Sequence, residues 1–441
     1  MILIGGGRTI TRSDSHPYFS DGCVAVEGSR IVEVGETKAM RKKYPHAEWV
    51  DVDGKLIMPG FINMHQHIYS ALARGMSLKN AKVSKNFDEI LENLWWRLDR
   101  ALGLEAIKYS ALTTYIDGIK NGVTTVFDHH ASAGHIEGSL MEIAKVAEKL
   151  GVRTNLAYEV SDRDGEDKMR AGIKENIDFY EYAKTRDDMV GALFGLHASF
   201  TLSEETLKQC VDAGGAEIGF HVHVAEGRGD VADSFLKYEM PVVKRFEKAG
   251  ILGPKTLAIH CIHIDDAEKD ILKATGTAVI HNPQSNMGNA VGCADVLGMF
   301  GRGVLMGLGT DGYTADMIES MKAAGLIHKH VSGDPSAAWA EPPAMLFKNN
   351  AAIAGRYMSG KVGALEKDAY ADLIVVDYDP PTPLDETNID GHIHFGMMGK
   401  QVVSTMINGK FVYKDRVILN ADEKEVLAKS RETAKTLWER A

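Results

Sequence analysis

Apolar, β-branched residues recur in short runs through the middle of the chain, and helical patterns separate each run from the next. Eight such runs occur, at residues 56–62, 123–127, 153–158, 192–196, 218–222, 256–259, 277–280 and 304–308. Apolar runs that alternate with helices are typical of parallel strands buried on both faces. Eight of them predict an α/β fold, a closed (β/α)8 TIM-type barrel whose chemistry lies at the carboxyl ends of its strands.

The two ends of the chain show a different pattern, with short strands joined by tight turns. Residues 23–27 and 30–34 flank Gly28-Ser29, and residues 402–407 and 411–413 flank Asn408-Gly409, so each pair predicts a hairpin. We therefore expect one small β-sandwich domain built from both chain ends, beside the barrel. The expected division is residues 1–56 and 363–420 for this domain, 57–362 for the barrel and 421–441 for a C-terminal helix.

Composition narrows the class of protein. Hydrophobic residues make up 44% of the 441 residues, which is enough for a large core. No uninterrupted apolar stretch reaches about 18 residues, so we expect no membrane span. The net charge of −11 argues against non-specific nucleic-acid binding. The first residues lack the features of an export signal and the four cysteines form no CxxC pair, so we expect a cytoplasmic protein.

Histidines and carboxylates follow several of the predicted barrel strands. His65 and His67 end the first run, and residues two apart in a strand point to the same side, so two imidazoles are available to one metal ion. That pair alone is weak evidence, because two half-buried polar residues give the same pattern. Later runs end in HVHVAE at 221–226, HCIH at 260–263 and GTDG at 309–312. Together these side chains predict a metal-dependent hydrolase.

The motifs PGFINMHQH, HVHVAE, HCIH, HNPQSN and GTDG, in this order and spacing, resemble those of the amidohydrolase superfamily. More narrowly, they are similar to its mononuclear deaminase and chlorohydrolase branch, which includes guanine deaminase, adenosine-type deaminases and atrazine chlorohydrolase. Residues 86–98 and 128–132 most resemble the SsnA-type aminohydrolases. The resemblance covers essentially the whole chain. It implies one divalent metal ion, zinc or alternatively iron, bound by His65, His67, His223 and Asp311, with Glu226, His260 and Asp311 as catalytic residues.

Two neighbouring histidines and one carboxylate need separate interpretation. His221 lies two residues before His223, and the His-x-x-Glu spacing of the family selects His223 as the ligand. We assign His263 to support or packing. The region after the fourth run has no lysine that could bridge two metal ions, and Glu159 is the only carboxylate that could replace one. We therefore expect one metal ion, which leaves His197 available to contact the substrate.

A bound divalent ion lowers the pKa of its water from about 15.7 to roughly 7, so hydroxide is available at neutral pH. Glu226 would carry a proton from that water to the ring nitrogen beside the attacked carbon, and ammonia would then leave. The sequence thus predicts hydrolytic deamination of a small amino-substituted nitrogen heterocycle, in particular a purine or pyrimidine base.

The substrate contacts are predicted less directly, because each candidate also has a packing role open to it. The candidates, which lie near the strand ends or on the helix that precedes residue 100, are Gln66, Tyr69, Trp95, His130, His197 and Asn286. Alternation along the first strand could turn Gln66 away from the metal. Of Trp95 and Trp96, which are adjacent on one helix, one is expected to pack in the core.

Two alternatives stay open at this point. A dechlorinase or another C–N hydrolase acting on a heteroaromatic ring would need almost the same site, although Glu226 favours deamination because a departing amine needs a proton. A metal-binding protein without activity would be expected to have an incomplete ligand set. The expected partner is a small heterocyclic substrate, with no nucleic acid and no membrane, and family analogy suggests a homodimer.

Overall fold

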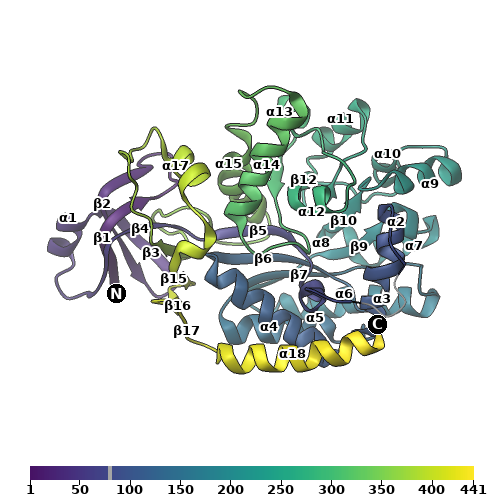
Figure 1. Ribbon diagram of the computed structural model, residues 1–441, viewed down its shortest axis with the longest axis horizontal. Helices are drawn as coiled ribbons and strands as arrows, with labels where there is room; N and C mark the ends of the chain where they lie inside the picture. Colours follow the sequence, from purple (N-terminus) through teal and green to yellow (C-terminus); the bar gives the residue numbers. More distant parts are fainter. Residues whose placement is uncertain (78–81) are drawn as a thin grey trace.

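The computed structural model describes residues 1–77 and 82–441. It confirms the predicted class, a parallel barrel with a small β domain packed at one side (Figure 1). The barrel strands are β5 (Phe61–Gln66), β6 (Val123–His130), β7 (Arg153–Tyr158), β8 (Val190–Ala192), β9 (Phe194–Ala198), β10 (Phe220–Val224), β11 (Leu257–His260), β12 (Ala278–His281) and β13 (Met306–Leu308). Strands β8 and β9 share the fourth position, so the predicted fourth run is interrupted at Leu193.

The barrel is hydrogen-bonded as two parallel sheets, in the orders β5-β6-β7-β8 and β9-β10-β11-β12-β13. Both seams between the sheets are closed by backbone pairing. Val160 pairs with Leu196 at the first seam, and Gln66 pairs with Asp311 at the second. The carboxyl ends of β5 and β13 therefore meet, which brings the residues after the first and eighth strands together.

The prediction of one continuous strand at residues 56–62 is wrong, because the structure divides this run at Gly60. Strand β4 (Glu48–Pro59) belongs to the small β domain, and β5 begins at Phe61. A Cβ atom at Gly60 would lie 2.1 Å from the side chain of Thr124, so only glycine fits at this crossing. An uninterrupted apolar run does not reveal that its two halves pair with different sheets.

The small β domain joins strands from both ends of the chain. Its strands are β1 (Ile2–Ile10), β2 (Tyr18–Glu27), β3 (Arg30–Glu36), β4, β14 (Leu373–Val376), β15 (Val402–Ile407), β16 (Lys410–Lys414) and β17 (Val417–Ile418). Strand β4 pairs with β1 on one side and with β14 on the other, so the two chain ends form one hydrogen-bonded order, β17-β16-β15-β14-β4-β1-β2-β3. Both predicted hairpins are present, as β2–β3 and β15–β16.

The helices surround the barrel, except for α1, which packs against β1, β2 and β3 of the small β domain (Figure 1). They are α1 (Thr37–Lys43), α2 (Phe87–Ile90), α3 (Trp96–Ala101), α4 (Leu104–Lys120), α5 (Ser139–Leu150), α6 (Glu166–Ala183), α7 (Glu204–Cys210), α8 (Ala216–Ile218), α9 (Arg228–Tyr238), α10 (Val242–Lys248), α11 (Asp266–Thr275), α12 (Pro283–Gly288), α13 (Val296–Gly301), α14 (Met317–Ser332), α15 (Glu341–Ala344), α16 (Asn350–Ala354), α17 (Ile389–Gly396) and α18 (Glu423–Arg440). Within the described ranges, no helix combines the length and apolar character needed to cross a bilayer.

The last helix, α18, lies along the outside of the barrel beside α4 (Figure 1). Ser430 hydrogen-bonds Thr113 of α4 at 3.0 Å. The indole Nε1 of Trp438 donates to the carbonyl of Leu72 at 2.7 Å. Leu72 belongs to the short 3-10 helix η1 (Ile68–Ala73), which follows β5 directly. The C-terminal helix therefore supports the segment that leaves the end of the first barrel strand.

Candidate active site

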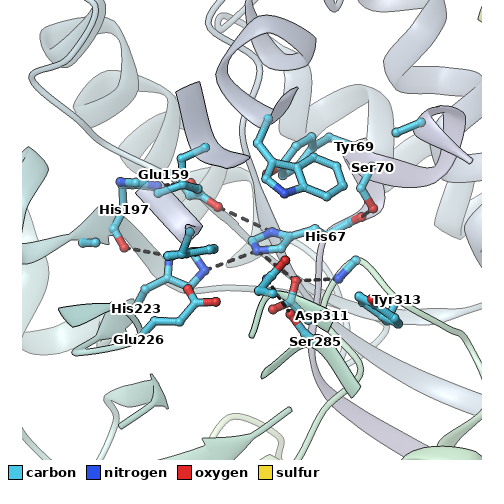
Figure 2. Close-up of a pocket in the computed structure, with 18 of the residues that line it drawn as sticks. His67, Tyr69, Ser70, Glu159, His197, His223, Glu226, Ser285, Asp311 and Tyr313 are labelled. Carbon is cyan, nitrogen blue, oxygen red and sulfur yellow. Dashed lines mark hydrogen bonds and ion pairs between the residues drawn. The ribbon is translucent and has the colours of Figure 1, made fainter. Parts of the chain in front are cut away.

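The predicted site residues meet at the carboxyl ends of the barrel strands, around a cavity of about 440 Å³ (Figure 2). His65 and His67 come from β5 and its end, His223 from β10, and Asp311 directly follows β13. His65 is fully buried, and the side chain of Asp311 is 12% exposed. Parallel strands bring these residues together because all of their carboxyl ends lie on one side of the barrel.

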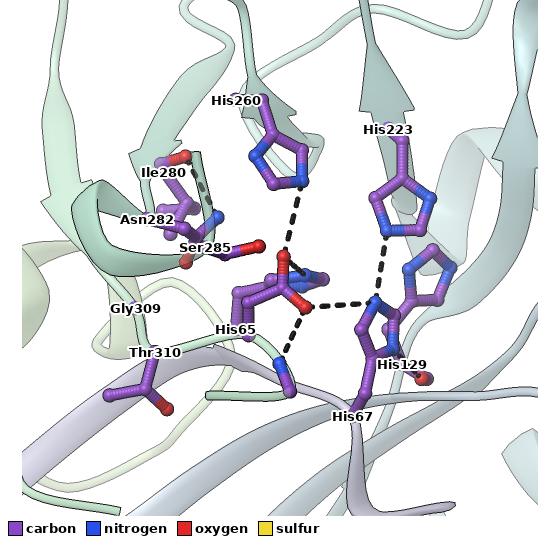
Figure 3. Close-up of polar contacts among 12 residues, drawn as sticks. His65, His67, His129, His223, His260, Ile280, Asn282, Ser285, Gly309 and Thr310 are labelled. Atoms are coloured by element: carbon purple, nitrogen blue, oxygen red, sulfur yellow. Dashed lines mark hydrogen bonds and ion pairs between the residues drawn. The ribbon is translucent and has the colours of Figure 1, made fainter. Parts of the chain in front are cut away.

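The rings of His67 and His223 are oriented by backbone carbonyls. His67 Nδ1 donates to the carbonyl of His129 at 2.6 Å, and His223 Nδ1 donates to the carbonyl of His197 at 2.8 Å. Each ring therefore carries its hydrogen on Nδ1, which leaves a lone pair on Nε2. These two Nε2 atoms face one another at 3.2 Å (Figure 3). Two opposed lone pairs at this distance repel unless a cation lies beside them.

His65 completes the same arrangement from the other side. Its Nδ1 lies 2.8 Å from Nε2 of His221, whereas its buried Nε2 has no hydrogen-bond partner among the described residues. The carboxylate of Asp311 lies 3.5 Å from His67 Nε2 and 3.9 Å from His65 Nε2. Three imidazole nitrogens and one carboxylate thus face a common point, and their other nitrogens are held by neighbouring groups. His65, His67 and Asp311 form one group whose donor atoms all lie within 4.8 Å of one another, and so do His65, His223 and His260, so these side chains fit a divalent metal ion. A further group of this kind joins His67 and His223 to His129 and Glu159.

Burial gives these histidines the protonation state that metal binding requires. Burial lowers the pKa of His65 and of His223 well below the usual range, and the neighbouring histidines lower it further. The rings are therefore neutral, as metal ligands must be.

Glu226 and His260 lie beside this donor set. His260 Nε2 is 3.4 Å from Glu226 Oε2 and 3.5 Å from Asp311 Oδ2, and its Nδ1 donates to Asn286 Oδ1 at 2.8 Å. Burial, and then the charge of Asp311, raise the pKa of Glu226 well above the usual range. A carboxyl group whose pKa is raised in this way holds a proton more readily than a free carboxyl group, which suits a residue that delivers protons in acid–base catalysis.

The backbone of the site adopts conformations that side-chain-bearing residues rarely occupy. Ala225, His260, Cys261 and Asp311 have φ angles of 47°, 70°, 49° and 57°. Left-handed backbone in non-glycine residues is uncommon, and it persists where the surroundings enforce it. Here it occurs at Ala225, next to Glu226, and at His260 and Asp311 themselves. The surrounding structure therefore holds a strained backbone that orients these side chains toward the site.

Three of the six predicted substrate contacts line the cavity, and the other three do not. Tyr69, Trp95 and His197 line the cavity. Gln66, His130 and Asn286 are not among its lining residues. The side chain of Gln66 accepts from Asn63 Nδ2 at 3.0 Å, His130 Nε2 pairs with Ser132 at 3.0 Å, and Asn286 supports His260.

Other cavity residues were not among the predicted substrate contacts, although Ser285 lies in the HNPQSN motif and Phe87 and Asp88 lie in the segment 86–98. Phe87, Phe200 and Tyr313 add aromatic surface, whereas Asp88, Ser285 and Asn289 add polar groups. These residues come from several loops and short helices, among them α2 and α12, and the sequence pattern does not show that they line one cavity. His263 is absent from this lining, and its supporting role stays a prediction.

Three further buried residues lie near the metal donors, and the family motifs assign none of them as a metal ligand. They are His129, Glu159 and His221. His221 contacts His65, and His129 stacks on His221 with a ring separation of 4.3 Å. Glu159, which follows β7, lines the cavity, and burial raises its pKa well above the usual range. Alternation indicates that 221 and 223 face the same side of β10, but it does not reveal which ring reaches the metal.

Comparison with known proteins places the chain in a family. The amidohydrolase family model matches residues 56–412, and an imidazolonepropionase-like composite domain of bacteria matches residues 22–47. A 5-methylthioadenosine/S-adenosylhomocysteine deaminase of Pelotomaculum thermopropionicum is 31% identical, with 100% of this chain and 99% of that protein covered. A 5′-deoxyadenosine deaminase of Methanosarcina acetivorans is 30% identical, with the same coverage of 100% and 99%.

Solved structures show the same fold. An adenosine deaminase from Xanthomonas campestris with bound zinc has a TM-score of 0.86 at 21% identity, covering 99% of this chain and 98% of that one. The family match spans the barrel and continues into the C-terminal strands, and the relatives align over the whole chain. The chain therefore belongs to the amidohydrolase family, in its mononuclear deaminase branch, and is a hydrolase that acts on C–N bonds.

Proposed function

We propose that this enzyme deaminates a 6-aminopurine-type ring with the help of one zinc ion held by His65, His67, His223 and Asp311. The observation that carries the proposal is the position of His260 between two carboxylates, with its Nε2 3.4 Å from Glu226 Oε2 and 3.5 Å from Asp311 Oδ2. Hydrolysis at an amidine-like carbon needs an activated water and a group that moves protons on the same side of the ring, and this arrangement offers both.

The donor set suits zinc. Three imidazole nitrogens and one carboxylate are common zinc ligands, and a divalent ion bound there lowers the pKa of its water to about 7. Iron binds the same donor types, so the ligands alone do not separate the two metals. Zinc is favoured because the adenosine deaminase from Xanthomonas campestris and the atrazine chlorohydrolase from Arthrobacter aurescens, with TM-scores of 0.86 and 0.83, were both solved with zinc.

The proton steps belong to Glu226 and His260. His260 donates its Nδ1 hydrogen to Asn286, so its Nε2 can accept a hydrogen bond from the attacking water and orient it. Glu226 takes a proton from this water and delivers it to the ring nitrogen beside the attacked carbon. The resulting Glu226 carboxylate can then take the remaining proton of the former water from the hydroxyl group of the tetrahedral adduct and pass it to the departing amine, so that the C=O bond forms as the C–N bond breaks; a departing chloride would not need this proton.

The cavity fits a flat heterocycle. Tyr69, Phe87, Trp95, Phe200 and Tyr313 supply aromatic walls around about 440 Å³, which lies in the usual range for small-molecule sites. The relatives from Pelotomaculum thermopropionicum and Methanosarcina acetivorans act, according to their names, on adenosine derivatives. This supports a 6-aminopurine ring as the substrate.

Replacement of Glu226 tests this function directly. We expect E226Q to lower kcat for ammonia release by about 10²- to 10⁴-fold, because the amide cannot carry the proton. KM should change little, and the variant should keep its metal, because Glu226 is not among the proposed ligands. The matched control is E175Q, which alters another buried carboxylate that accepts from the backbone of Gly138 and Leu140 outside the cavity. Near-full turnover by metal-loaded E226Q would contradict the proposal.

A further inference from the structure

The backbone next to Glu226 is held by hydrogen bonds on both of its polar groups. Glu226 lies in the turn between β10 and α9, and its side chain lines the cavity (Figure 2). The residue before it, Ala225, has a φ angle of 47°, which a residue with a side chain adopts only where its surroundings enforce it. The carbonyl of Ala225 accepts from the N–H of His263 at 3.0 Å. The N–H of Ala225 donates to a side chain, that of Asp230.

Asp230 lies in the first turn of α9 and uses both carboxylate oxygens on backbone groups of other segments. Its Oδ2 accepts from the N–H of Ala225 at 2.9 Å, and its Oδ1 accepts from the N–H of Phe200 at 2.9 Å. Phe200 belongs to the 3-10 helix η3 (Ser199–Thr201), which follows β9. Asp230 is only 4% exposed, and burying a carboxylate costs free energy that these two bonds offset. The side chain therefore ties the turn that carries Glu226 to the segment after the neighbouring strand.

The common structural roles of a buried aspartate do not account for Asp230. An acidic residue in the first turn of a helix often caps N–H groups of that helix, but the partners of Asp230, Ala225 and Phe200, lie outside α9. No ion pair joins Asp230 to a basic residue in the part of the chain that the structure describes. Arg245, whose charge acts on Asp230, pairs instead with Glu204 at 2.8 Å.

The segment at the other end of this tie is anchored independently of Asp230. Arg245 is buried, and its guanidinium donates to the carbonyls of Ser199 and Leu202 at 2.7 and 2.6 Å. These bonds hold η3 in place without Asp230. Loss of the Asp230 carboxylate is therefore expected to release the turn that carries Glu226 rather than η3.

From these contacts we infer that Asp230 is a positioning residue that holds Glu226 in the orientation from which its carboxyl group moves protons during deamination. The inference rests on the proposed function, since the proposed function assigns the proton steps to Glu226. Glu226 Oε2 lies 3.4 Å from His260 Nε2, and a misplacement of about 1 Å at such a group can lower a rate by about 100-fold. The bond that fixes the backbone next to Glu226 should thus control turnover.

Removal of the carboxylate tests this role. We expect metal-loaded D230A to lower kcat for ammonia release from adenosine by about 10- to 100-fold, with KM within about threefold of the wild type and with unchanged metal content. D230N, which replaces one accepting oxygen with an NH2 group, should lower kcat by at least about threefold, and it takes the place of D230A if that variant does not fold. D233A is the matched control and should keep wild-type kinetics, because Asp233 lies on the same helix but pairs with Lys237 at 2.7 Å.

Combination with E226Q separates an effect through Glu226 from a general loss of structure. The residual kcat of D230A/E226Q should lie within about threefold of that of E226Q, because the group that Asp230 positions is already lost. A further loss of about 10-fold or more in the double variant overturns the inference. Wild-type kcat in D230A and D230N, or an effect confined to KM, overturns it as well.

A crystal structure of metal-loaded D230A gives a result that does not depend on turnover. We expect the Glu226 carboxylate to move by about 1 Å or more from its wild-type position while η3 stays in place. A Glu226 side chain that keeps its wild-type position overturns the inference. If E226Q retains near-full turnover while D230A displaces Glu226, the proposed function fails and the role of Asp230 in holding Glu226 stands.

Discussion

His221 shows how a side chain that is not a proposed metal ligand can orient one that is. Its Nε2 lies 2.8 Å from His65 Nδ1, and its ring stacks on His129. Backbone carbonyls orient the other two metal-facing rings, but His65 depends on this side chain. Groups that hold the second nitrogen of a metal-binding histidine typically change metal affinity by about 10- to 100-fold when they are removed.

We therefore expect H221F to weaken metal binding by about 10- to 100-fold, as measured by competition with a chelator, while the variant stays folded. Phenylalanine keeps the ring volume and the stacking surface but cannot hydrogen-bond His65. H328F is the matched control, since His328 belongs to a separate buried histidine pair with His281 at 3.1 Å. Wild-type metal affinity in H221F would show that His65 needs no such support.

The sequence indicates the candidate metal donors more directly than the residues that orient them, and the reason is physical. Strand alternation and the position of a run relative to its strand end are local properties, and they indicated His65 and His67, whereas the His-x-x-Glu spacing of the family selected His223 over His221. The supporting contacts join residues far apart in sequence, such as His65 with His221, which are 156 positions apart. Local periodicity carries no information on such contacts, so the roles assigned to the site residues stay predictions.

Among the helices and strands, the seam between β13 and β5 depends on one side chain at the start of α16. Asn350 Nδ2 donates to the carbonyls of Ile62 and Leu308 at 2.8 and 2.9 Å, and its Oδ1 accepts from the N–H of Leu308 at 2.8 Å. Asn350 is fully buried. It therefore joins the first and eighth barrel strands where the backbone ladder is incomplete, just below the pairing of Gln66 with Asp311.

We expect N350A to lower the free energy of unfolding by about 2–4 kcal/mol, because it leaves buried backbone groups of two strands unpaired. Denaturant unfolding measures this change. N349A is the comparison, since Asn349 makes one side-chain bond, to the carbonyl of Met306 at 2.7 Å, and should cost about 1 kcal/mol. Equal losses for the two variants would contradict a special role for Asn350 in closing the barrel.

The elements themselves were largely predictable because buried parallel strands leave an apolar signature that hairpins and helices do not share. The exceptions lie where tertiary structure overrides the local pattern. The run at 56–62 is apolar throughout, but close packing of Gly60 on Thr124 redirects the chain from one sheet to the other. The seam residue Asn350 carries no sequence signal, because an asparagine in a helix is ordinarily a surface residue.

In the whole molecule, two segments from the C-terminal part of the chain support the barrel that carries the site. Strand β7 is tied to the small β domain by Arg153, whose guanidinium lies 3.2 Å from the carboxylate of Asp372 and donates to the carbonyl of Asp188 at 2.7 Å. Helix α18 holds the segment after β5 through Trp438. The division of the chain at residues 1–56, 57–362, 363–420 and 421–441 stays a prediction, as such contacts make the parts interdependent.

The central claim is that the converging histidines and Asp311 hold one metal ion on which deamination depends. The most direct test is to remove metal from the wild type with a chelator, return zinc in steps and follow ammonia release from adenosine. We predict no turnover without metal and a linear rise that levels off at one zinc per chain. Turnover that survives metal removal, or that needs two ions per chain, would contradict this account of the site.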